Sequence, residues 1–342
     1  MVTIKDSRQA ETKDITLYEA LGLTKDDLLE MYYKLVLSRM LDERMWVLNR
    51  QGKAPFTISC QGHEVAGIGS IWAIEPGQDF VLPYYRDLGV VLTLGMTPRE
   101  LLLAVLARAG EPTSGAKQMP AHYGYPKLNI ISGSSPVATQ IPHAAGIALA
   151  AKIKGESSVA IVYFGDGATS KGDFHEGINF AAIHKLPVIF VCENNDYAIS
   201  VPHSKQMAID NVSERAAAYG IPGVTVDGCD LLAVYQVTKA AVERGREGGG
   251  PTLIEAKVPR MTGHSSDDDE KRYRTQEELE DCKNRDPLVK TREWLMNEGI
   301  LSQEKEREFR DKALAEIDDA TDFALNSPYP SPEEVLTNVY SS

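Results

Sequence analysis

Two apolar runs in the middle of the chain predict neighbouring strands of a parallel sheet. Residues Val159 to Phe164 read VAIVYF without a polar interruption, a pattern typical of a strand buried on both faces. A second run, Val188 to Cys192, follows a stretch that we interpret as a helix. This helix is expected to begin at Asp173, with Glu176 completing a capping box, and to end near His184. Together the three segments predict one strand, helix and strand unit with parallel strands.

The same alternation of apolar runs and helical patterns continues on both sides of this unit. Thr24 is expected to cap a long helix to about Leu48, and Thr97 to begin a helix that runs to about Ala109. A loop over residues 110–135 is long enough to suggest function. The remaining expected elements are an alanine-rich helix from Val137 to Lys152, a helix near 212–219, a strand from Gly223 to Val226, a helix from Leu231 to about Arg244, a strand over 252–258, and helical segments at Gln276 to Met296 and Gln303 to Leu325.

This order of elements predicts an α/β fold with a mostly parallel sheet and helices on both of its faces. We divide the chain into an N-terminal helical extension (residues 1–50), a central α/β domain (51–274) and a C-terminal helical extension (275–342).

Composition limits the classes of partner. The formal net charge of −13 argues against binding to nucleic acid, because a phosphate backbone would be repelled. Four cysteines without a CxxC pair indicate reduced thiols. No apolar run is long enough for a membrane span, and the first 14 residues resemble neither a secretory signal nor a transit peptide. We therefore expect a cytoplasmic protein without a membrane partner.

Polar residues follow both central strands at their carboxyl ends. Gly-Asp-Gly (165–167) follows the first strand and Asn-Asn (194–195) follows the second. Either sequence alone is an ordinary turn, but two of them after adjacent buried strands favour a ligand site at the sheet edge. Asp166, the side-chain oxygen of Asn195 and a backbone carbonyl such as that of Tyr197 would give Mg²⁺ three oxygen ligands beside a diphosphate.

Six motifs, in a fixed order, carry a resemblance to a known family. They are VLPYYRDLG (81–89), KQMPAHYG (117–124), SSPVATQIPHAAG (134–146), the segment 165–195, CENNDYAISVP (192–202) and GHSSDDDEKRYR (263–274). The chain resembles the alpha subunit of the first, decarboxylating component of 2-oxoacid dehydrogenase complexes, and most of all its bacterial branched-chain members. The resemblance implies a thiamine diphosphate-binding fold, with thiamine diphosphate and Mg²⁺ as cofactors.

Site residues can be carried over where the motifs match. The resemblance implies cofactor contacts by Tyr85, Arg86, Ser135, Val137, Gly165, Asp166, Gly167, Ala168, Asn195, Tyr197 and His264, with Asp166, Asn195 and Tyr197 binding the metal. His122 and His264 lie in glycine-rich loops and are the candidate catalytic residues, expected to handle protons near neutral pH. In some members a potassium ion, K⁺, is held at the positions of Ser134, Pro136, Thr139 and Gln140.

The chain departs from the mammalian branched-chain pattern at two positions. Gly-Asp-Gly stands in place of Gly-Glu-Gly, which shortens the metal-binding carboxylate by one methylene. Glu193 stands where an arginine contacts the diphosphate in that relative. Diphosphate binding is therefore expected to depend more on Arg86, His264 and the backbone amides at the start of the 173–184 helix.

The resemblance also implies a reaction and partners. The reaction is oxidative decarboxylation of 2-oxoisovalerate and related branched-chain 2-oxoacids, in branched-chain amino acid catabolism, with acyl transfer to lipoyl-lysine on a dihydrolipoyl acyltransferase. A beta subunit, in a tetramer of two alphas and two betas, would supply the glutamate that activates the cofactor, which we cannot identify in this sequence. Pyruvate or acetoin as substrate, or a catalytically silent subunit, remain alternatives. A dinucleotide-binding dehydrogenase is disfavoured because GxGxxG is absent.

The acidic loop at 263–274 has two interpretations. Ser265 matches a regulatory phosphoserine of the mammalian relative, but nothing in the sequence indicates a kinase. The plainer interpretation is a mobile active-site loop that becomes ordered when the cofactor binds.

Overall fold

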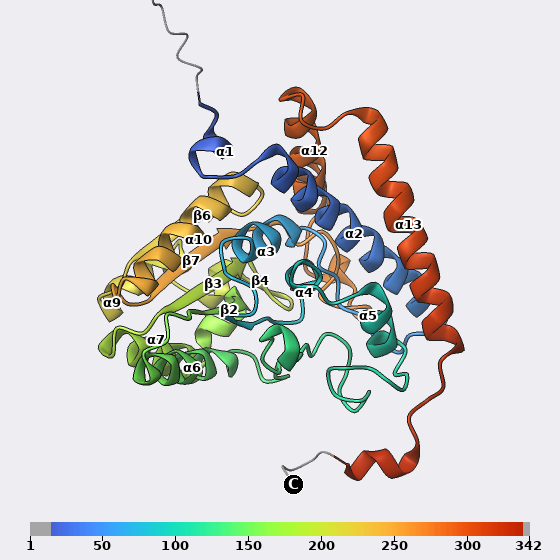
Figure 1. Cartoon of the computed structure of the whole chain (residues 1–342), viewed down its shortest axis with the longest axis horizontal. Helices are drawn as coiled ribbons and strands as arrows, with labels where there is room; N and C mark the ends of the chain where they lie inside the picture. Colours follow the sequence, from blue (N-terminus) through green and yellow to red (C-terminus); the bar gives the residue numbers. More distant parts are fainter. Residues whose placement is uncertain (1–14, 338–342) are drawn as a thin grey trace, which may run out of the picture.

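The chain is built around a five-stranded parallel sheet (Figure 1). The computed structural model describes residues 15–337, so the expectations for residues 1–14 and 338–342 lie outside the described residues. The strands follow one another across the sheet in the order β1 (Phe80–Leu82), β2 (Ala160–Gly165), β3 (Val188–Asn194), β7 (Thr252–Lys257) and β6 (Gly223–Asp227). Every neighbouring pair is parallel. The predicted α/β fold with a parallel sheet is confirmed.

Alternate residues of the strands enter two hydrophobic cores, one on each face of the sheet. Ile161 and Tyr163 of β2 face the first core and Val162 and Phe164 face the second. The first core is covered by α2 (Lys25–Arg50), α3 (Glu64–Ile71), α4 (Leu88–Leu94) and α10 (Leu231–Arg246). The second is covered by α6 (Gln140–Lys154) and α7 (Gly172–Ile183), which lie below the sheet in Figure 1. Continuous apolar runs are therefore required in β2 and β3, because both of their faces are buried.

The C-terminal helix α13 (Gln303–Asn326) packs along α2 and against α5 (Pro98–Val105). Its residues Phe309 and Ile317 belong to the same hydrophobic core as the sheet. One hydrophobic core contains residues of all three segments into which we divided the chain. The three-part division stays a prediction. The other elements are α1 (Leu17–Ala20), η1 (Pro126–Leu128), η2 (Asp166–Ser170), β4 (Tyr197–Ala198), β5 (Val201–Pro202), α8 (His203–Gln206), η3 (Val212–Arg215), α9 (Ala216–Tyr219), η4 (Glu270–Arg272), α11 (Gln276–Asn284), α12 (Pro287–Asn297) and η5 (Pro332–Leu336).

Several expected boundaries were wrong for identifiable reasons. The capping box at Asp173 does not form, because α7 already begins at Gly172 and Asp173 lies within its first turn. Helix α5 ends at Val105, and Ala107 takes a left-handed conformation with φ of 50°. The expected helix 276–296 is divided because Pro287, which has no N–H to donate, begins a new helix.

None of the helices in the described part of the chain is long and apolar enough to cross a membrane. The four cysteines are free.

Helices α6 and α7 approach each other closely at a glycine. A Cβ added at Gly177 would lie 2.8 Å from both Ile141 Cγ2 and the backbone nitrogen of Pro142. Backbone at that distance cannot move aside without shifting the helix, so this position admits only glycine.

We predict that Gly177→Ala lowers the free energy of unfolding by about 1 to 3 kcal/mol, because the added methyl group overpacks the contact between the helices. The measurement is chemical unfolding followed by circular dichroism. Gly146→Ala in α6 is the matched control, because a Cβ there meets no atom within 4 Å. The control should be neutral or stabilising by up to about 1 kcal/mol. Equal loss in both variants would contradict the explanation.

Candidate active site

A cavity of about 430 Å³ lies at the carboxyl ends of β1, β2 and β3. It is lined by every cofactor residue that the sequence predicts, namely Tyr85, Arg86, Ser135, Val137, Gly165, Asp166, Gly167, Ala168, Asn195, Tyr197 and His264, and by His122. These residues come from loops spread over 180 positions of the chain. The structure brings them together because parallel strands end at one edge of the sheet. Their individual roles stay predictions.

Asp166 follows β2 directly and its side chain is fully buried. Its Oδ2 accepts a hydrogen bond of 2.8 Å from Gln206 Nε2, while its Oδ1 has no partner. Burial raises the pKa of this carboxyl, and the hydrogen bond from the amide of Gln206 partly counters that effect. A buried carboxylate oxygen without a hydrogen bond is costly, and a bound cation would satisfy it.

Asn195 follows β3, the strand that pairs with β2, so its amide lies beside Asp166 at the sheet edge. Asn195 Oδ1 accepts a hydrogen bond of 3.2 Å from the backbone N–H of Tyr197, the first residue of β4. Within residues 15–337, no three His, Cys, Asp or Glu side chains are close enough together to hold a metal ion. A metal here would therefore have one carboxylate, one amide and backbone or phosphate oxygens, a set that suits Mg²⁺ rather than Zn²⁺.

Gly167 lets the turn after β2 pack directly on β4. A Cβ added at Gly167 would lie 2.7 Å from the Cβ of Ala198. The turn itself, η2, lines the cavity through Gly167 and Ala168, whereas α7 begins further along the chain and does not line it. The expectation that the first amides of α7 bind the diphosphate stays a prediction, and the backbone at the cavity wall is that of η2.

Arg86 supplies the positive charge of the cavity and is only 2% exposed. Its Nη1 donates to the carbonyl of Ser59 at 2.6 Å. Its Nη2 lies 3.1 Å from His264 Nδ1 and donates to the His264 carbonyl at 3.0 Å. Because the guanidinium can only donate, His264 Nδ1 is an acceptor and the ring proton is carried by Nε2.

His264 differs from its expected behaviour. Burial, with the positive charges of Arg86 and Arg260, lowers its pKa from 6.5 to about 4. The expectation that this imidazole titrates near neutral pH is therefore wrong for the cavity as described. At neutral pH it is uncharged and offers an N–H at Nε2, so it serves as a hydrogen-bond donor.

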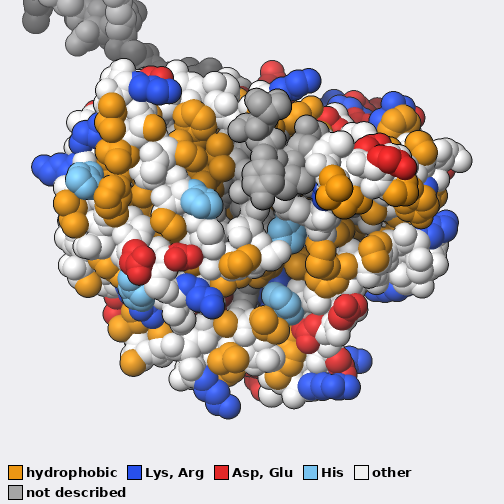
Figure 2. Space-filling view, turned by 90° about the horizontal axis from the view of Figure 1, so that it is seen from below, with side chains coloured by type: hydrophobic (Ala, Val, Ile, Leu, Met, Phe, Trp, Pro, Cys, Tyr) orange, Lys and Arg blue, Asp and Glu red, His pale blue; other side chains and the backbone are white. Residues whose placement is uncertain are grey.

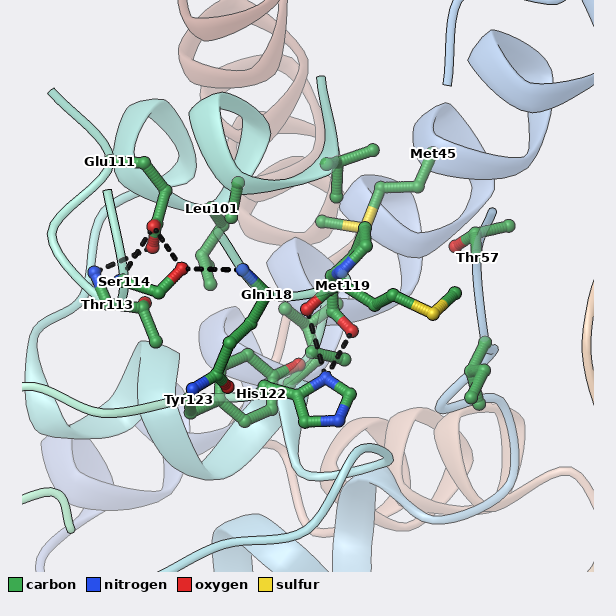
Figure 3. Close-up of a pocket in the computed structure, with 16 residues that line it drawn as sticks. Met45, Thr57, Leu101, Glu111, Thr113, Ser114, Gln118, Met119, His122 and Tyr123 are labelled. Carbon is green, nitrogen blue, oxygen red and sulfur yellow. Dashed lines mark hydrogen bonds between the residues drawn. The ribbon is translucent and has the colours of Figure 1, made fainter. Parts of the chain in front are cut away.

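His122 is held in the opposite tautomer by the loop that carries it. Figure 3 shows its Nδ1 facing the carbonyl oxygens of Met119 and Pro120, to which it donates at 2.9 and 3.3 Å. Its Nε2 lies 2.5 Å from Ser135 Oγ and accepts a hydrogen bond from that hydroxyl. At the cavity wall, the lone pair of His122 Nε2 is thus directed at the hydroxyl of Ser135.

The four residues of the predicted potassium site are only partly at the cavity. Ser134 and Gln140 line it, whereas Pro136 and Thr139 do not. Gln140 Nε2 donates to the carbonyl of Tyr163 at 3.1 Å, and its Oε1 is buried without a partner.

Sequence reasoning missed the polar layer beneath the cavity. Glu193 was expected to reduce the positive charge facing the diphosphate, but its side chain is fully buried and does not line the cavity. It accepts hydrogen bonds from His63 and Tyr84 instead. Asp42, buried in α2, accepts from Ser59, Cys60 and Gln61 and thereby fixes the segment whose carbonyl holds Arg86. Charged residues inside apolar helical patterns, such as Asp42, were the available signal.

The parallel sheet, with an acid and an amide at the ends of adjacent strands, defines an α/β fold with a candidate ligand site at the sheet edge. A family model described as "Dehydrogenase E1 component" matches residues 32–333, and the chain belongs to this family.

Curated relatives match nearly the whole chain. It is 54% identical over 324 residues to the 2-oxoisovalerate dehydrogenase subunit alpha of Bacillus subtilis (strain 168), covering 95% of this chain and 98% of that protein. It is 41% identical over 319 residues to the pyruvate dehydrogenase E1 component subunit alpha of Staphylococcus aureus (strain Mu50), covering 93% of this chain and 83% of that protein. The corresponding subunit of Staphylococcus epidermidis is 39% identical over the same length.

The depressed pKa of His264 predicts a pH dependence of stability. In the unfolded chain its pKa returns to about 6.5, so between pH 6.5 and 4 the unfolded state binds a proton that the folded state does not. Stability that is present above pH 6.5 is therefore lost as the pH falls. Allowing for the partial exposure of the ring, we expect about 1 kcal/mol less stability at pH 5 than at pH 7 from this residue.

His264→Gln removes the titration and should reduce that pH dependence by the same amount. Urea unfolding of both proteins at pH 5 and pH 7 measures it. Parallel pH profiles for the two proteins would show that His264 has an ordinary pKa.

Proposed function

We propose that this chain is the cofactor-binding alpha subunit of a thiamine diphosphate-dependent branched-chain 2-oxoacid dehydrogenase, with 2-oxoisovalerate as its main substrate. The identity of 54% to a 2-oxoisovalerate dehydrogenase subunit, against 41% to a pyruvate dehydrogenase subunit, supports the branched-chain substrate. The lining of the cavity supports the cofactor, because it combines an unpaired buried carboxylate oxygen, an amide and a buried arginine.

These residues fit thiamine diphosphate with Mg²⁺. Asp166 Oδ1, Asn195 Oδ1 and the carbonyl of Tyr197 would bind the metal, and Arg86 would bind the diphosphate beside it. When bound, the cofactor supplies a carbon nucleophile for the 2-oxo group and a ring that stores electrons after CO₂ leaves. Apolar side chains of Phe56, Ile58, Met119 and Val137 line the rest of the cavity and would keep water from the reacting centre.

The two histidines then have separate roles. His264 would stay neutral, with Nδ1 accepting from Arg86, and its Nε2–H would donate a hydrogen bond to an oxygen of the substrate or the diphosphate. His122 Nε2 accepts a hydrogen bond from Ser135 Oγ and would act as a base toward a group of the substrate in the cavity.

One observation supports a second subunit more than any other. Among the described residues that line the cavity, Asp166 is the sole acid and no glutamate is present. The glutamate that activates the cofactor would therefore come from a beta subunit, in a tetramer of two alphas and two betas.

An apolar surface is available for such a partner. Figure 2 shows hydrophobic side chains gathered on the face that includes α6 and α7, where Ile153, Phe180 and Ile183 are exposed. Further partners in this proposal are the lipoyl domain of a dihydrolipoyl acyltransferase and a potassium ion at Gln140 Oε1. The cytoplasmic location expected from the sequence stays a prediction.

The decisive experiment uses this chain co-expressed with its candidate beta subunit. Decarboxylation is followed with an artificial electron acceptor on 2-oxoisovalerate, pyruvate and acetoin, with and without thiamine diphosphate and Mg²⁺. We expect cofactor-dependent turnover that is highest on 2-oxoisovalerate and at least 100-fold lower for the alpha chain alone, corresponding to about 2.7 kcal/mol in the barrier.

Each other result changes the proposal in a defined way. Highest turnover on pyruvate or acetoin would replace the substrate and keep the mechanism. No turnover from a stable complex would favour a catalytically silent subunit. Equal turnover by the alpha chain alone would contradict the shared active site.

Arg86→Ala should weaken thiamine diphosphate binding by more than tenfold at fixed Mg²⁺, because a buried cation beside the diphosphate is lost. The measurement is the dissociation constant from quenching of tryptophan fluorescence in the assembled complex. Arg99→Ala is the control, because Arg99 pairs with Asp319 on the surface and does not line the cavity. A dissociation constant unchanged by Arg86→Ala would remove Arg86 from the diphosphate site.

A further inference from the structure

Two side chains that the sequence does not single out contact the proposed metal ligands from behind. His63 Nε2 lies 3.3 Å from Asn195 Nδ2, and Gln206 Nε2 donates to Asp166 Oδ2 at 2.8 Å. In both cases the contact is made to the atom of the ligand that would not face the metal. Neither His63 nor Gln206 lines the cavity.

The hydrogen-bond partners of His63 define its tautomer. It is the N-cap residue of α3 and is 1% exposed. Its Nδ1 lies 2.7 Å from Glu193 Oε2, which also accepts the hydroxyl of Tyr84 at 2.9 Å. A carboxylate only accepts, so Nδ1 carries the ring proton and Nε2 has a free lone pair. His63 Nε2, held in this state by Glu193 at the other ring nitrogen, therefore presents an acceptor toward Asn195.

The orientation of the Asn195 amide follows from its two neighbours. The N–H of Tyr197 donates to its Oδ1 at 3.2 Å, which fixes the oxygen on the cavity side. Its Nδ2 then faces His63 Nε2 and donates to the lone pair there. With the amide turned round, two hydrogen-bond acceptors would face each other at His63, and the N–H of Tyr197 would meet an N–H₂ group. The amide oxygen is therefore directed to the position that a metal would take.

Gln206 holds Asp166, the second proposed side-chain ligand of the metal, by a similar contact. It lies at the end of the short helix α8 and donates through one nitrogen to Asp166 Oδ2 and to the carbonyl of Val201, at 2.8 and 2.9 Å. The carbonyl of Val201 belongs to β5, which pairs with β4 beside the cavity. The Asp166 carboxylate is thus tied on one oxygen while Oδ1 stays free of hydrogen bonds.

We propose that His63 and Gln206 are positioning residues for the metal ion, each holding one side-chain ligand so that its free oxygen points at the ion. This inference rests on the proposed function, because it takes Asp166 and Asn195 as the metal ligands. Partners that orient metal ligands in this way commonly change metal affinity by 10- to 100-fold. Glu193 takes part indirectly, since its carboxylate fixes the tautomer of His63.

The test is metal binding by the assembled complex of this chain and its beta subunit. Mn²⁺ replaces Mg²⁺, thiamine diphosphate is saturating, and free Mn²⁺ is measured by electron paramagnetic resonance. We expect His63→Ala and Gln206→Ala each to raise the Mn²⁺ dissociation constant by about 10- to 100-fold.

His63→Gln separates positioning from a general structural role. The glutamine can accept from Asn195 through its oxygen and donate to Glu193 through its nitrogen, so it should restore most of the affinity that His63→Ala loses. Ser70→Ala is the matched control, because Ser70 is equally buried on α3 and bonds to Ala66, Gly67 and Tyr163 instead. Its Mn²⁺ dissociation constant should stay within twofold of the unchanged protein.

Asn195→Ala distinguishes failure of this inference from failure of the proposed site. If Asn195→Ala weakens Mn²⁺ binding and the changes at His63 and Gln206 do not, the positioning role is wrong and the metal site stands. If Asn195→Ala leaves binding unchanged, the metal site and this inference are both wrong. Equal weakening by Ser70→Ala would also overturn the inference. Should His63→Ala fail to assemble, Gln206→Ala and His63→Gln decide the matter.

Discussion

Parallel pairing of β2 with β3 is the constraint on which the site depends. The register places Gly165 opposite Glu193, so β2 and β3 end at nearly the same level of the sheet. Asp166 and Asn195, which follow these two strands, therefore lie side by side. In an antiparallel pair the same two residues would lie at opposite ends of the sheet. Because both faces of these strands are packed in hydrophobic cores, a shift of register by one residue would exchange the side chains that enter each core and disrupt the packing of both. The hydrophobic cores thus fix the separation of the ligands, and no loop has to do so.

The same arrangement brings several charges into an environment with little water. Arg86, Asp166, Glu193 and Asp87 are all buried. Burial and the neighbouring Glu193 raise the pKa of Asp87 well above its ordinary value. Each group has a hydrogen-bond partner: Arg86 donates to backbone carbonyls, Asp87 accepts from the backbone N–H of Tyr84, Glu193 accepts from an imidazole and a phenol, and Asp166 accepts from an amide at one oxygen. The oxygens left without partners are where further charge would be stabilised, which is how a protein prepares a binding site before its ligand arrives.

Much of this could be predicted from the sequence, and the exceptions have a common cause. Strands β2 and β3, helices α2 and α10 and the loop 110–135 follow from local patterns, since apolar runs and caps report on a segment and its immediate neighbours. The residues that line the cavity followed from motifs. The pairings of His63 with Glu193 and of Asp42 with the segment 59–61 did not, because they join residues far apart in the chain. The pKa of His264 was missed for the same reason, since Arg86 and Arg260 approach it only in the folded protein.

The cavity wall has a polar part and an apolar part, and this difference bears on the proposed second subunit. At the sheet edge it offers an acid, an amide, an arginine and a neutral histidine, all suited to a diphosphate and its metal. Another part of its wall carries the apolar side chains of Phe56, Ile58 and Met119, which suit an apolar ring and an aliphatic substrate chain, with His122 and Ser135 as polar residues of the loop 110–135. A carboxylic acid that activates the cofactor would have to lie against this apolar part of the wall. Burial there would raise the pKa of the acid and favour its neutral form, unless the cofactor ring takes part in a hydrogen bond with it. Placing that acid on a second chain would make its burial conditional on assembly, so that the isolated subunit need not stabilise an unpaired carboxylate in its own apolar wall.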